Sequence, residues 1–474
     1  MNSIKKTKIV CTIGPATESE KMLGELINAG MNVARLNFSH GDFAEHQLRV
    51  DSLRKIMKRT GQSVAILQDL AGPKIRIGEF EKGLTVLKEG AKFTITIDKI
   101  MGSDEKVSIN YPLFIKEVKV GDPVLLHDGK KKLEVIEIKG NDVICKVIVG
   151  GEIKSKRGVN LPGSDLTVSS ITEKDREDLK FGLKNKVDFF ALSFVRQPED
   201  ITELKEILKK AKCEARVIAK IETPQALKNI DEIIRLSDGI MVARGDLAIE
   251  IPAENVPLVQ KMLIQKCNQA GKPVITATQM LESMINSPIP TRAEVSDVAN
   301  AILDGTDAIM LSEETTLGQF PIKAVEMMTR ISEKTESDSQ YRNLVTSRKF
   351  SDSVKRVSDA LCNGAMEVAK ESGARVIVSL TDSGFTARMI SRYKPEQKIL
   401  ALTPNEKTRK QLSLSYGCVS VVCKKFVQIS EAIKEAKALT LKSKMAVKGD
   451  KIVVVFGFPF GKTGGTNSLI VETL

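Results

Sequence analysis

Short apolar runs alternate with amphipathic stretches along most of this 474-residue chain, and this alternation constrains the fold more than any other feature. The runs are rich in Val and Ile and lie at 8–14, 31–39, 64–70, 187–195, 216–222, 238–246, 273–279 and 308–314. Stretches with a helical period separate most of them, for example 18–29, 199–211 and 256–270. Near-continuous apolar strands joined by amphipathic helices are typical of a parallel sheet covered on its outer face. Eight such units predict an α/β fold built on a (β/α)8 TIM barrel.

Most of these predicted strands end in polar side chains that a purely structural strand does not need. The side chains are Arg35, Asn37, Asp69, Ser193, Lys220, Glu222, Arg244, Asp246, Thr278, Ser312 and Glu314. In a TIM barrel the C-terminal ends of the strands meet on one face, and the chemistry takes place there. So many polar strand ends predict an active site on that face.

Residues 73–158 interrupt the alternation. Short strand-like segments separated by Gly and Asp turns lie there at 93–97, 106–109 and 143–149. We therefore expect a small all-β domain, a β-barrel, inserted after the third barrel strand, with hinges at Gly72-Pro73 and at Gly158. A domain inserted above the active face is well placed to act as a lid.

The chain turns polar at 337–353 and loses its apolar period, which indicates a linker. Beyond it, predicted helices at 354–371 and 429–446 alternate with predicted strands at 374–380, 399–402, 419–422 and 451–456. The predicted domains are the barrel (1–72 and 159–336), the inserted lid (73–158) and a C-terminal α/β regulatory domain (354–474).

The net charge of +12 narrows the binding partners only slightly. Tryptophan is absent and only four tyrosines are present, which argues against a base-stacking nucleic-acid surface. Small phosphorylated molecules suit a basic protein, although a lysine-rich solvated surface explains most of the charge. We expect no membrane segment and no signal peptide. Seven scattered cysteines without a Cys-x-x-Cys pair favour a reducing, cytoplasmic location.

Several longer strings carry a specific resemblance. They lie at 32–41 (NVARLNFSHG), 156–162 (KRGVNLP), 218–222 (IAKIE), 241–246 (MVARGD), 277–284 (ATQMLESM) and 290–300 (PTRAEVSDVAN). With them the chain resembles the pyruvate kinase family over essentially its whole length, including the order of the domains. The resemblance implies transfer of a phosphoryl group from phosphoenolpyruvate to ADP, giving pyruvate and ATP in the final step of glycolysis. It also implies a homotetramer.

The carboxylates Glu222 and Asp246 follow predicted strands five and six. Two hard oxygen ligands suit Mg²⁺, which completes its shell with substrate and water. In the family the corresponding pair binds a divalent metal, Mg²⁺ or Mn²⁺. The alternative is that Asp246 caps a turn and that Glu222 pairs with a lysine.

Lys220 precedes Glu222 by two residues, so both side chains point to the same face of a strand. A lysine aimed into a barrel mouth is costly unless it meets negative charge, and phosphoryl transfer supplies that charge. The resemblance assigns Lys220 to the transferring phosphoryl group and Arg35 to the same phosphate, whose geometry a guanidinium matches. Surface ion pairs are the alternative for both.

The resemblance places Thr278 nearest the step in which an enolate receives a proton. Because a threonine hydroxyl is a poor acid, Thr278 either relays a proton through bound water or only orients the substrate. Gly245 has no side chain and so allows backbone amides to approach the substrate carboxylate. A simple turn-forming glycine is the alternative.

For the nucleotide, Arg76 and Arg157 flank the hinges of the inserted domain and match phosphate-contacting positions of the family. Asn37 and His40 are candidates for the same pocket, although a histidine just past a strand is more often structural. Asp128 is a candidate for reaching the nucleotide's metal when the lid closes, but Asp-Gly is also an ordinary turn.

Most members of the family need potassium, near the positions that match Asn37, Ser39, Asp69 and Leu70. This chain has Lys74 where the potassium-requiring members usually carry glutamate, and Leu70 where they carry threonine. An ammonium group is itself a monovalent cation and would repel K⁺. We therefore predict that activity needs Mg²⁺ but not K⁺.

The C-terminal domain contains a hydroxyl-rich segment between a predicted strand and helix, a natural anion site. Its candidate residues are Thr381, Ser383, Gly384 and Thr386. The segment resembles the loop that holds a sugar-phosphate or nucleotide effector in regulated members, and 460–467 lies where the family has its effector loop. Capping of the helix is the alternative.

Two other departures, Glu313 and Ala248 where glycine is common, would reshape nearby loops without removing a proposed catalytic group. The rival functions are another metal-dependent barrel enzyme that acts on phosphoenolpyruvate or a related keto acid without ADP, and a catalytically silent metabolite-binding protein. Dependence on ADP separates the first from a pyruvate kinase, and turnover separates the second.

Overall fold

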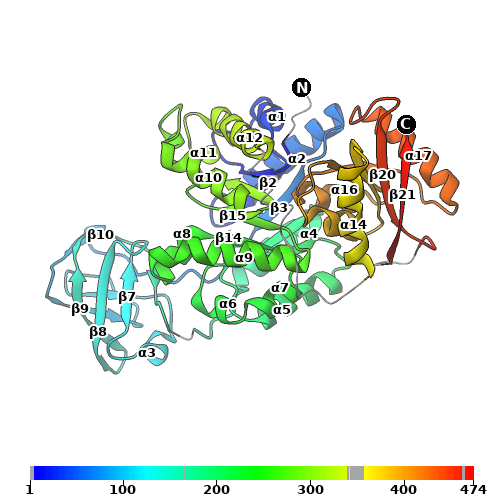
Figure 1. The fold of residues 1–474 in the computed structure, drawn as a ribbon. Coiled ribbons are helices and arrows are strands. Elements are labelled where there is room, and N and C mark those ends of the chain that lie inside the picture. The colour runs from blue at the N-terminus through cyan, green and yellow to red at the C-terminus, as the bar shows by residue number, and fades with distance from the viewer. Residues whose placement is uncertain (1–4, 165, 339–340, 342–356, 462–464) are drawn as a thin grey trace.

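The structure is a computed structural model that describes residues 5–164, 166–338, 341, 357–461 and 465–474. Along this chain a central barrel lies between a small β-domain and a C-terminal α/β domain (Figure 1). The predicted linker at 337–353 lies almost entirely outside the described residues.

Eight parallel strands close into the central barrel, as the alternation predicted. They are β1 (Lys8–Thr12), β2 (Val33–Asn37), β3 (Ala65–Asp69), β12 (Phe189–Leu192), β13 (Arg216–Ile221), β14 (Gly239–Ala243), β15 (Val274–Ala277) and β16 (Ala308–Leu311). Neighbours in the barrel follow chain order, and β1 pairs with β16 to close it, with Lys8 opposite Ala308.

The strands read as continuous apolar runs because both of their faces are buried. In β1, Val10 belongs to the core inside the barrel, whereas its neighbours Ile9 and Cys11 belong to the core between strands and helices. Successive side chains of a strand point to opposite faces, so each strand contributes to both cores.

Helices cover the outside of the barrel (Figure 1). The α-helices are α1 (Glu20–Ala29), α2 (Phe43–Thr60), α4 (Glu173–Lys184), α5 (Pro198–Lys210), α6 (Pro224–Lys228), α7 (Ile230–Leu236), α8 (Arg244–Glu250), α9 (Val256–Ala270), α10 (Arg292–Asp304), α11 (Glu313–Thr316) and α12 (Pro321–Ser337). Short 3₁₀ turns occur at η1 (Ala253–Asn255) and η2 (Glu282–Ile285). Capping explains several boundaries: Thr291 and Glu294 form a capping box that starts α10, and Gly305 ends it with φ of 97°.

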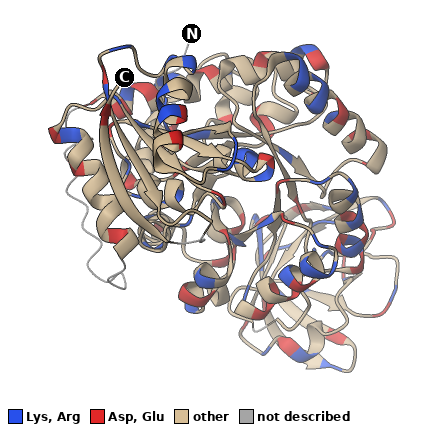
Figure 2. Ribbon diagram, turned by 90° about the vertical axis from the view of Figure 1, so that its right-hand side faces the viewer, with Lys and Arg blue, Asp and Glu red and all other residues tan. Residues whose placement is uncertain are grey.

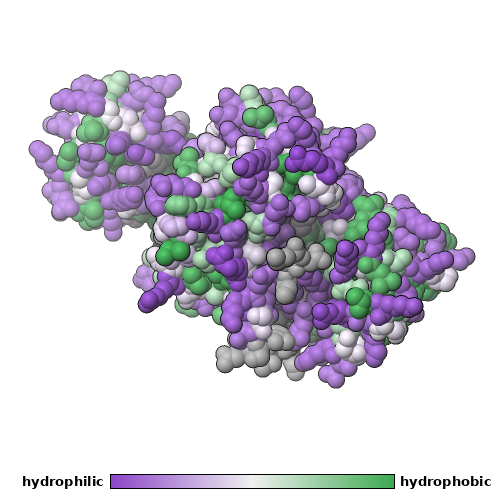
Figure 3. Space-filling view, turned by 90° about the horizontal axis from the view of Figure 1, so that it is seen from above, coloured by the Kyte–Doolittle hydropathy of each residue, from purple (hydrophilic) through white to green (hydrophobic). Residues whose placement is uncertain are grey.

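Between β3 and α4 the chain forms the inserted domain. Its strands are β4 (Leu84–Leu87), β5 (Lys92–Thr96), β6 (Lys106–Ser108), β7 (Pro123–Leu126), β8 (Lys131–Lys139), β9 (Asp142–Val149), β10 (Gly151–Lys154) and β11 (Val159–Asn160). They form a six-stranded and a two-stranded sheet around a separate core. One short helix, α3 (Phe114–Glu117), accompanies them, and β11 extends the larger sheet just past Gly158. In the space-filling view this domain is a distinct lobe with a mostly hydrophilic surface (Figure 3).

The C-terminal domain is a five-stranded sheet with helices. Its elements are α14 (Val357–Glu371), β17 (Val376–Leu380), α15 (Phe385–Ser391), β18 (Lys398–Thr403), α16 (Glu406–Gln411), η3 (Leu412–Leu414), β19 (Cys418–Val422), α17 (Ile429–Lys442), β20 (Lys451–Gly457) and β21 (Thr466–Thr473). The strand order is β19-β18-β17-β20-β21, and β21 runs antiparallel to β20. The sequence did not predict β21, because an edge strand with one exposed face lacks a continuous apolar run.

Lysine and arginine are spread over all three parts of the molecule and are interspersed with acidic residues (Figure 2). The basic excess is therefore not gathered into one large patch. Among the described residues, no helix has both the length and the apolar character that a membrane crossing needs.

Candidate active site

A lysine, an arginine and two carboxylates meet at the C-terminal ends of β2, β3 and β13. Lys220 Nζ lies 2.8 Å from Glu222 Oε1 and 3.4 Å from Asp69 Oδ1, and it donates a hydrogen bond to Ser193 Oγ at 2.6 Å. Arg35 Nε lies 2.6 Å from Asp69 Oδ2. The two cations therefore share Asp69, and the barrel brings together residues that are far apart in the chain.

These groups are buried and set one another's charge. Burial disfavours the charged form of Lys220, but Asp69, Glu222 and Asp246 together raise its pKa above the usual range. Burial also disfavours the ionised form of Asp69, yet Lys220 and Arg35 hold its pKa below the usual value. Burial raises the pKa of Glu222 to about 7, in spite of the attraction of Lys220. A firmly charged ammonium thus lies beside a carboxyl group that takes up a proton readily.

Glu222 and Asp246 fit a divalent metal. Glu222 Oε2 accepts a hydrogen bond from the backbone N–H of Phe194 at 2.6 Å, whereas Oε1 is buried and has only the ion pair with Lys220. Asp246 lies in the first turn of α8, where no side chain caps the helix. In the described part of the chain, no three His, Cys, Asp or Glu residues form a complete metal cage. Mg²⁺ takes one or two protein carboxylates when substrate and water complete its shell, so this pair is sufficient.

Thr278 follows β15 in a strained backbone conformation. Its φ is 70° and that of Gln279 is 53°, a region that β-branched residues rarely enter. Thr278 Oγ1 accepts a hydrogen bond from Gly245 N at 2.8 Å and donates one to the Ala277 carbonyl at 2.6 Å. A Cβ built on Gly245 would lie 3.6 Å from Thr278, so the backbones after β14 and β15 approach closely. Such strain persists only where surrounding contacts enforce it.

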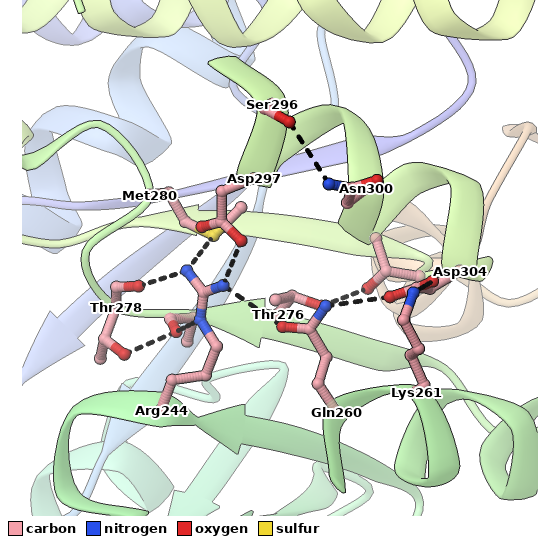
Figure 4. Close-up of polar contacts among 12 residues, drawn as sticks. Arg244, Gln260, Lys261, Thr276, Thr278, Met280, Ser296, Asp297, Asn300 and Asp304 are labelled. Carbon is pink, nitrogen blue, oxygen red and sulfur yellow. Dashed lines mark hydrogen bonds and ion pairs between the residues drawn. The ribbon is translucent and has the colours of Figure 1, made fainter. Parts of the chain in front are cut away.

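Arg244 supplies those contacts (Figure 4). Its guanidinium donates to the carbonyls of Ala277 and Thr278 at 3.2 and 2.7 Å. It also contacts Met280 Sδ at 2.8 Å and pairs with Asp297 of α10 at 2.7 Å. Arg244 therefore connects the Thr278 turn to a helix on the outside of the barrel. Its place at a strand end was visible in the sequence, but its acceptors were not.

A cavity of about 260 Å³ lies between the barrel mouth and the inserted domain. Asp246 lines it from α8, and Arg76, Arg157 and Asp128 line it from the inserted domain. Lys220 lies outside this lining, as do Arg35, Glu222, Gly245 and Thr278. The predicted nucleotide arginines thus share a cavity with one predicted metal ligand, whereas the buried cation cluster lies beside it.

The other predicted nucleotide residues are less closely tied to this cavity. Asn37 ends β2 and His40 lies in the turn that follows, and neither residue lines the cavity. Asn37 Oδ1 accepts a hydrogen bond from Ser39 N at 3.1 Å. His40 is largely exposed. Desolvation of its ring, together with the positive charges of Lys74 and Arg76, lowers its pKa. Arg157 Nε, in contrast, is buried without a hydrogen-bond partner in the described chain.

Lys74 lies where the sequence predicted an internal cation. It lines the cavity, and burial, Lys220 and Arg76 lower its pKa, whereas Asp246 and Asp69 raise it. Its ammonium forms no hydrogen bond or ion pair with any residue that the structure describes. Its charge is therefore available to the site. Leu70, the other departure in this region, is fully buried.

Sequence reasoning missed a contact between α8 and the inserted domain. Asn160 Nδ2 of β11 donates a hydrogen bond to Glu250 Oε1 at 2.9 Å, and both residues line the cavity. Burial raises the pKa of Glu250, the hydrogen bond from Asn160 lowers it, and the net change is upward. Asn160 lies within the string at 156–162 that carries the family resemblance, but nothing in the sequence pointed to Glu250.

The two unusual residues leave the buried cluster intact. Glu313 opens α11 and Ala248 lies within α8, and both are exposed. Neither side chain forms a hydrogen bond with a proposed catalytic residue in the described chain.

The hydroxyl-rich segment lines a second cavity, of about 310 Å³, in the C-terminal domain. Thr381, Ser383 and Thr386 line it, and Gly384 caps α15 with φ of 78°. The hydroxyls of Thr386 and Thr466 lie 2.7 Å apart. Lys424 and Lys425 also line this cavity, and residues 462–464 of the predicted effector loop lie outside the described chain.

A TIM barrel with buried cations and two carboxylates at its mouth, beside a basic cavity under an inserted domain, defines a metal-assisted phosphoryl-transfer enzyme. The pyruvate kinase barrel domain matches residues 4–325, and the pyruvate kinase alpha/beta domain matches residues 359–472. The chain belongs to the pyruvate kinase family, and it is a phosphotransferase that acts on phosphoenolpyruvate and ADP. Enzymes of this family use a divalent metal.

Individual relatives agree with the family match over the full chain. The pyruvate kinase of Clostridium perfringens is 46% identical over 476 residues, covering 99% of this chain and 100% of that protein. The pyruvate kinase of Staphylococcus aureus (strain MRSA252) is 47% identical over 475 residues, covering 99% of this chain and 80% of that protein. A crystal structure of a pyruvate kinase from Cryptosporidium parvum superposes with a TM-score of 0.93 at 39% identity, covering 99% and 96% of the two chains.

Proposed function

We propose that Lys220 and Arg35 bind the phosphoryl group of phosphoenolpyruvate and stabilise it during transfer to ADP. The observation that carries this proposal is the ammonium of Lys220, buried at the barrel mouth within 2.8 Å of Glu222 and 3.4 Å of Asp69. A buried cation aimed at the transferring oxygens needs no reorganisation when charge develops on them. Arg35 adds a planar donor from the neighbouring strand.

Glu222 and Asp246 hold the metal, Mg²⁺ or Mn²⁺. When bound, the metal supplies a Lewis acid that polarises substrate oxygens. The raised pKa of Glu222 supports this assignment, because a cation next to the pair would relieve the cost of keeping that carboxylate charged.

Thr278 and Gly245 position the carboxylate end of the substrate and the water that protonates the enolate. The Thr278 hydroxyl is fixed by Gly245 N and by the Ala277 carbonyl. A hydroxyl held in this way directs a water molecule, which suits a group too weakly acidic to act alone.

Arg76 and Arg157 bind the phosphates of ADP in the cavity under the inserted domain, with Asn37 and His40 at its edge. The inserted domain, 73–158 by the sequence boundaries, serves as the lid. Arg157 supports this role because its buried Nε lacks a partner that a phosphate oxygen would supply. Asp128 reaches the nucleotide's metal on closure.

Lys74 replaces K⁺, so activity requires no potassium. The site around Asn37, Ser39, Asp69 and Leu70 then needs no monovalent ion. The ammonium of Lys74 already interacts with the negative charges of Asp69 and Asp246, which raise its pKa. An added K⁺ would be repelled by the like charges of Lys74, Lys220 and Arg35.

The C-terminal cavity around Thr381, Ser383, Gly384 and Thr386 takes a sugar-phosphate or nucleotide effector. Its size and its two lysines support an anionic ligand. We further propose a homotetramer in the cytoplasm. This reducing compartment keeps the seven cysteines as free thiols and contains the glycolytic substrates.

The test is pyruvate formation from phosphoenolpyruvate and Mg·ADP, with KCl or with NaCl at equal ionic strength. We expect turnover that depends on ADP in both salts. Lys220→Gln should abolish it, whereas the matched variant Lys180→Gln, on the exposed face of α4, should be fully active. Active Lys220→Gln enzyme would refute the assignment of Lys220, and turnover only in KCl would refute the assignment of Lys74. Turnover without ADP would contradict the kinase reaction itself.

A further inference from the structure

A third cavity, of about 640 Å³, lies at the opposite end of β13 from the active site. The barrel side of this cleft is formed by Lys205 and Lys209 of α5 and by Arg216, the first residue of β13. The C-terminal domain contributes Ser383 and Arg388. The cleft therefore lies between the base of the barrel and the C-terminal domain, and the proposed active site does not include it.

Arg388 brings a positive charge into this cleft without a counterion. Its Nη1 donates to the carbonyl of Ser383 at 3.1 Å, and it forms no ion pair within the described residues. Burial and the nearby charge of Arg216 lower the pKa of Arg388 to about 9. A guanidinium that is half-buried beside another one, with only a carbonyl acceptor, is an unusual arrangement unless an anion completes it.

The neighbouring groups form no ion pair with Arg388 among the described residues, although the charge of Asp238 raises its pKa. Arg216 donates to Gln411 Oε1 and to the same Ser383 carbonyl, each at 2.8 Å. The charge of Asp238 raises the pKa of both arginines, but this carboxylate accepts a hydrogen bond from Val217 N at 2.9 Å and pairs with Lys205 at 3.2 Å.

The remaining acidic residues of the cleft, Glu214 and Asp382, are exposed, and neither is paired with an arginine in the described chain. Lys209 is also exposed and adds a further positive charge at the rim.

We propose that this cleft is an anion site that binds the phosphoryl group of a phosphate monoester between Arg388 and Arg216. Planar guanidinium groups match phosphate oxygens with paired hydrogen bonds. The volume exceeds what a bare phosphate fills and lies within the range of small-molecule sites. The exposed rim leaves room for the organic part of the ligand.

This site is separate from the hydroxyl-lined cavity of the C-terminal domain, although Asp382 and Ser383 border both. The chain provides a natural reporter for each. Cys213 lines the cleft and Cys423 lines the C-terminal cavity, and these are the half-exposed members of the cysteine set, the others being buried. Protection of one thiol and not the other therefore identifies which cavity a ligand occupies.

The experiment measures alkylation of each cysteine in the full chain by peptide mass spectrometry. The rates are compared in chloride, inorganic phosphate and glycerol 3-phosphate at equal ionic strength. We expect glycerol 3-phosphate to slow alkylation of Cys213 severalfold. Equal protection by inorganic phosphate would mean that the phosphoryl group alone is recognised, and protection only by the ester would identify a phosphorylated metabolite. No protection of Cys213, or protection of Cys423 alone, would overturn the proposal.

Variants assign the effect to the cleft. Arg388→Gln should raise the ligand concentration needed for half-protection about tenfold or more, the loss expected for a hydrogen bond to a charged group. Arg375→Gln, an equal charge change on the exposed surface of the same domain, should leave it unchanged. Lys209→Glu tests the rim without touching packed residues and should weaken protection even if Arg388→Gln folds poorly. Unaltered protection in both cleft variants would contradict the site. The test reads no catalysis, so it is independent of the proposed active-site roles.

Discussion

Lys220 and Glu222 illustrate how one pair of residues sets the chemistry of the site. They face the same way because they are two residues apart near the end of a strand, and each changes the charge of the other. The same spacing on a surface strand would give an exposed ion pair worth about 0–1 kcal/mol. Burial makes the pair responsive to a third charge.

Proton and metal should compete for Glu222. A pKa of about 7 means that Glu222 gains a proton as the pH falls through neutrality, and only its ionised form is a good metal ligand. We therefore expect Mn²⁺ affinity to fall by up to about tenfold per pH unit below neutrality and to level off above it. Electron paramagnetic resonance of free Mn²⁺, without substrates, measures this directly. Affinity that is constant from mildly acidic to mildly alkaline pH would contradict the assignment.

A single charge reversal should convert the cation requirement. Lys74→Glu removes the internal ammonium and places a carboxylate in its position, so we expect activity that depends on added KCl. The wild type should be equally active in KCl and NaCl. The matched control is Lys88→Glu, which makes the same change in the inserted domain on an exposed residue. A Lys74→Glu enzyme that is equally active in both salts would show that Lys74 is not the replacement.

Helix α10 helps to fix the position of the Thr278 turn, although the turn lies outside the helix. Asp297 holds Arg244, and Arg244 holds the carbonyls on either side of the strained Thr278 turn. Arg244→Gln should lower kcat by roughly 10- to 100-fold, the effect of a small displacement of reacting groups. Arg235→Gln on α7 is the matched control, because that arginine is exposed and pairs only locally.

The KM values distinguish positioning from substrate binding in this variant. We expect the KM for ADP to change little in Arg244→Gln. The Asp297→Asn variant keeps a hydrogen-bond acceptor for Arg244 and should therefore retain more activity than Arg244→Gln. Steady-state kinetics and the circular dichroism of each variant provide the comparison. Full activity in Arg244→Gln would contradict the positioning role.

The hydrogen bond between β11 and α8 should affect the binding of ADP more than the binding of phosphoenolpyruvate. Asn160→Ala removes the hydrogen bond to the partly buried Glu250 and loosens the inserted domain over the cavity. We expect the KM for ADP to rise up to about tenfold, in proportion to a hydrogen bond to a charged group, with little change in the KM for phosphoenolpyruvate. Asn141→Ala, which breaks the same type of bond to Asp98 at an exposed position, should change neither value. An equal rise in both KM values would argue against a lid.

The helices and strands differ in how well the sequence predicts them. Barrel strands were predictable because burial on both faces leaves long apolar runs, and strand-end residues such as Lys220 and Thr278 could be assigned to one face from topology alone. The edge strand β21 was missed because its exposed face breaks that pattern. The contacts of Glu250 and Asp297 were missed because each joins residues far apart in the sequence, and no local spacing records such a pair.

On the scale of the whole molecule, buried charges join the C-terminal domain to the base of the barrel. Lys394 pairs with Asp307 at 2.8 Å with both side chains buried, and Asp307 also accepts hydrogen bonds from the backbones of Val274 and Tyr416. Lys394→Met would leave Asp307 buried without its counterion. We expect a loss of about 3–5 kcal/mol in the free energy of unfolding.

Denaturant unfolding at neutral pH measures this loss. Lys448→Met is the matched control, because it removes a lysine from the exposed surface of the same domain and should have no effect. A Lys394→Met protein as stable as the wild type would show that the pair contributes nothing to the junction between the domains.

The pairing that closes the barrel delays its folding during synthesis on the ribosome. Of the barrel strands β1 is synthesised first, and its partner β16 is not synthesised until 300 residues later, since Lys8 pairs with Ala308. At about 5–20 residues per second, the first strand therefore waits roughly 15–60 s with one edge unpaired. The inserted domain, whose strands are contiguous in the chain, can fold during this wait. A nascent chain halted before β16 should thus be open to proteases and to chaperones in its barrel, while its inserted domain already resists digestion.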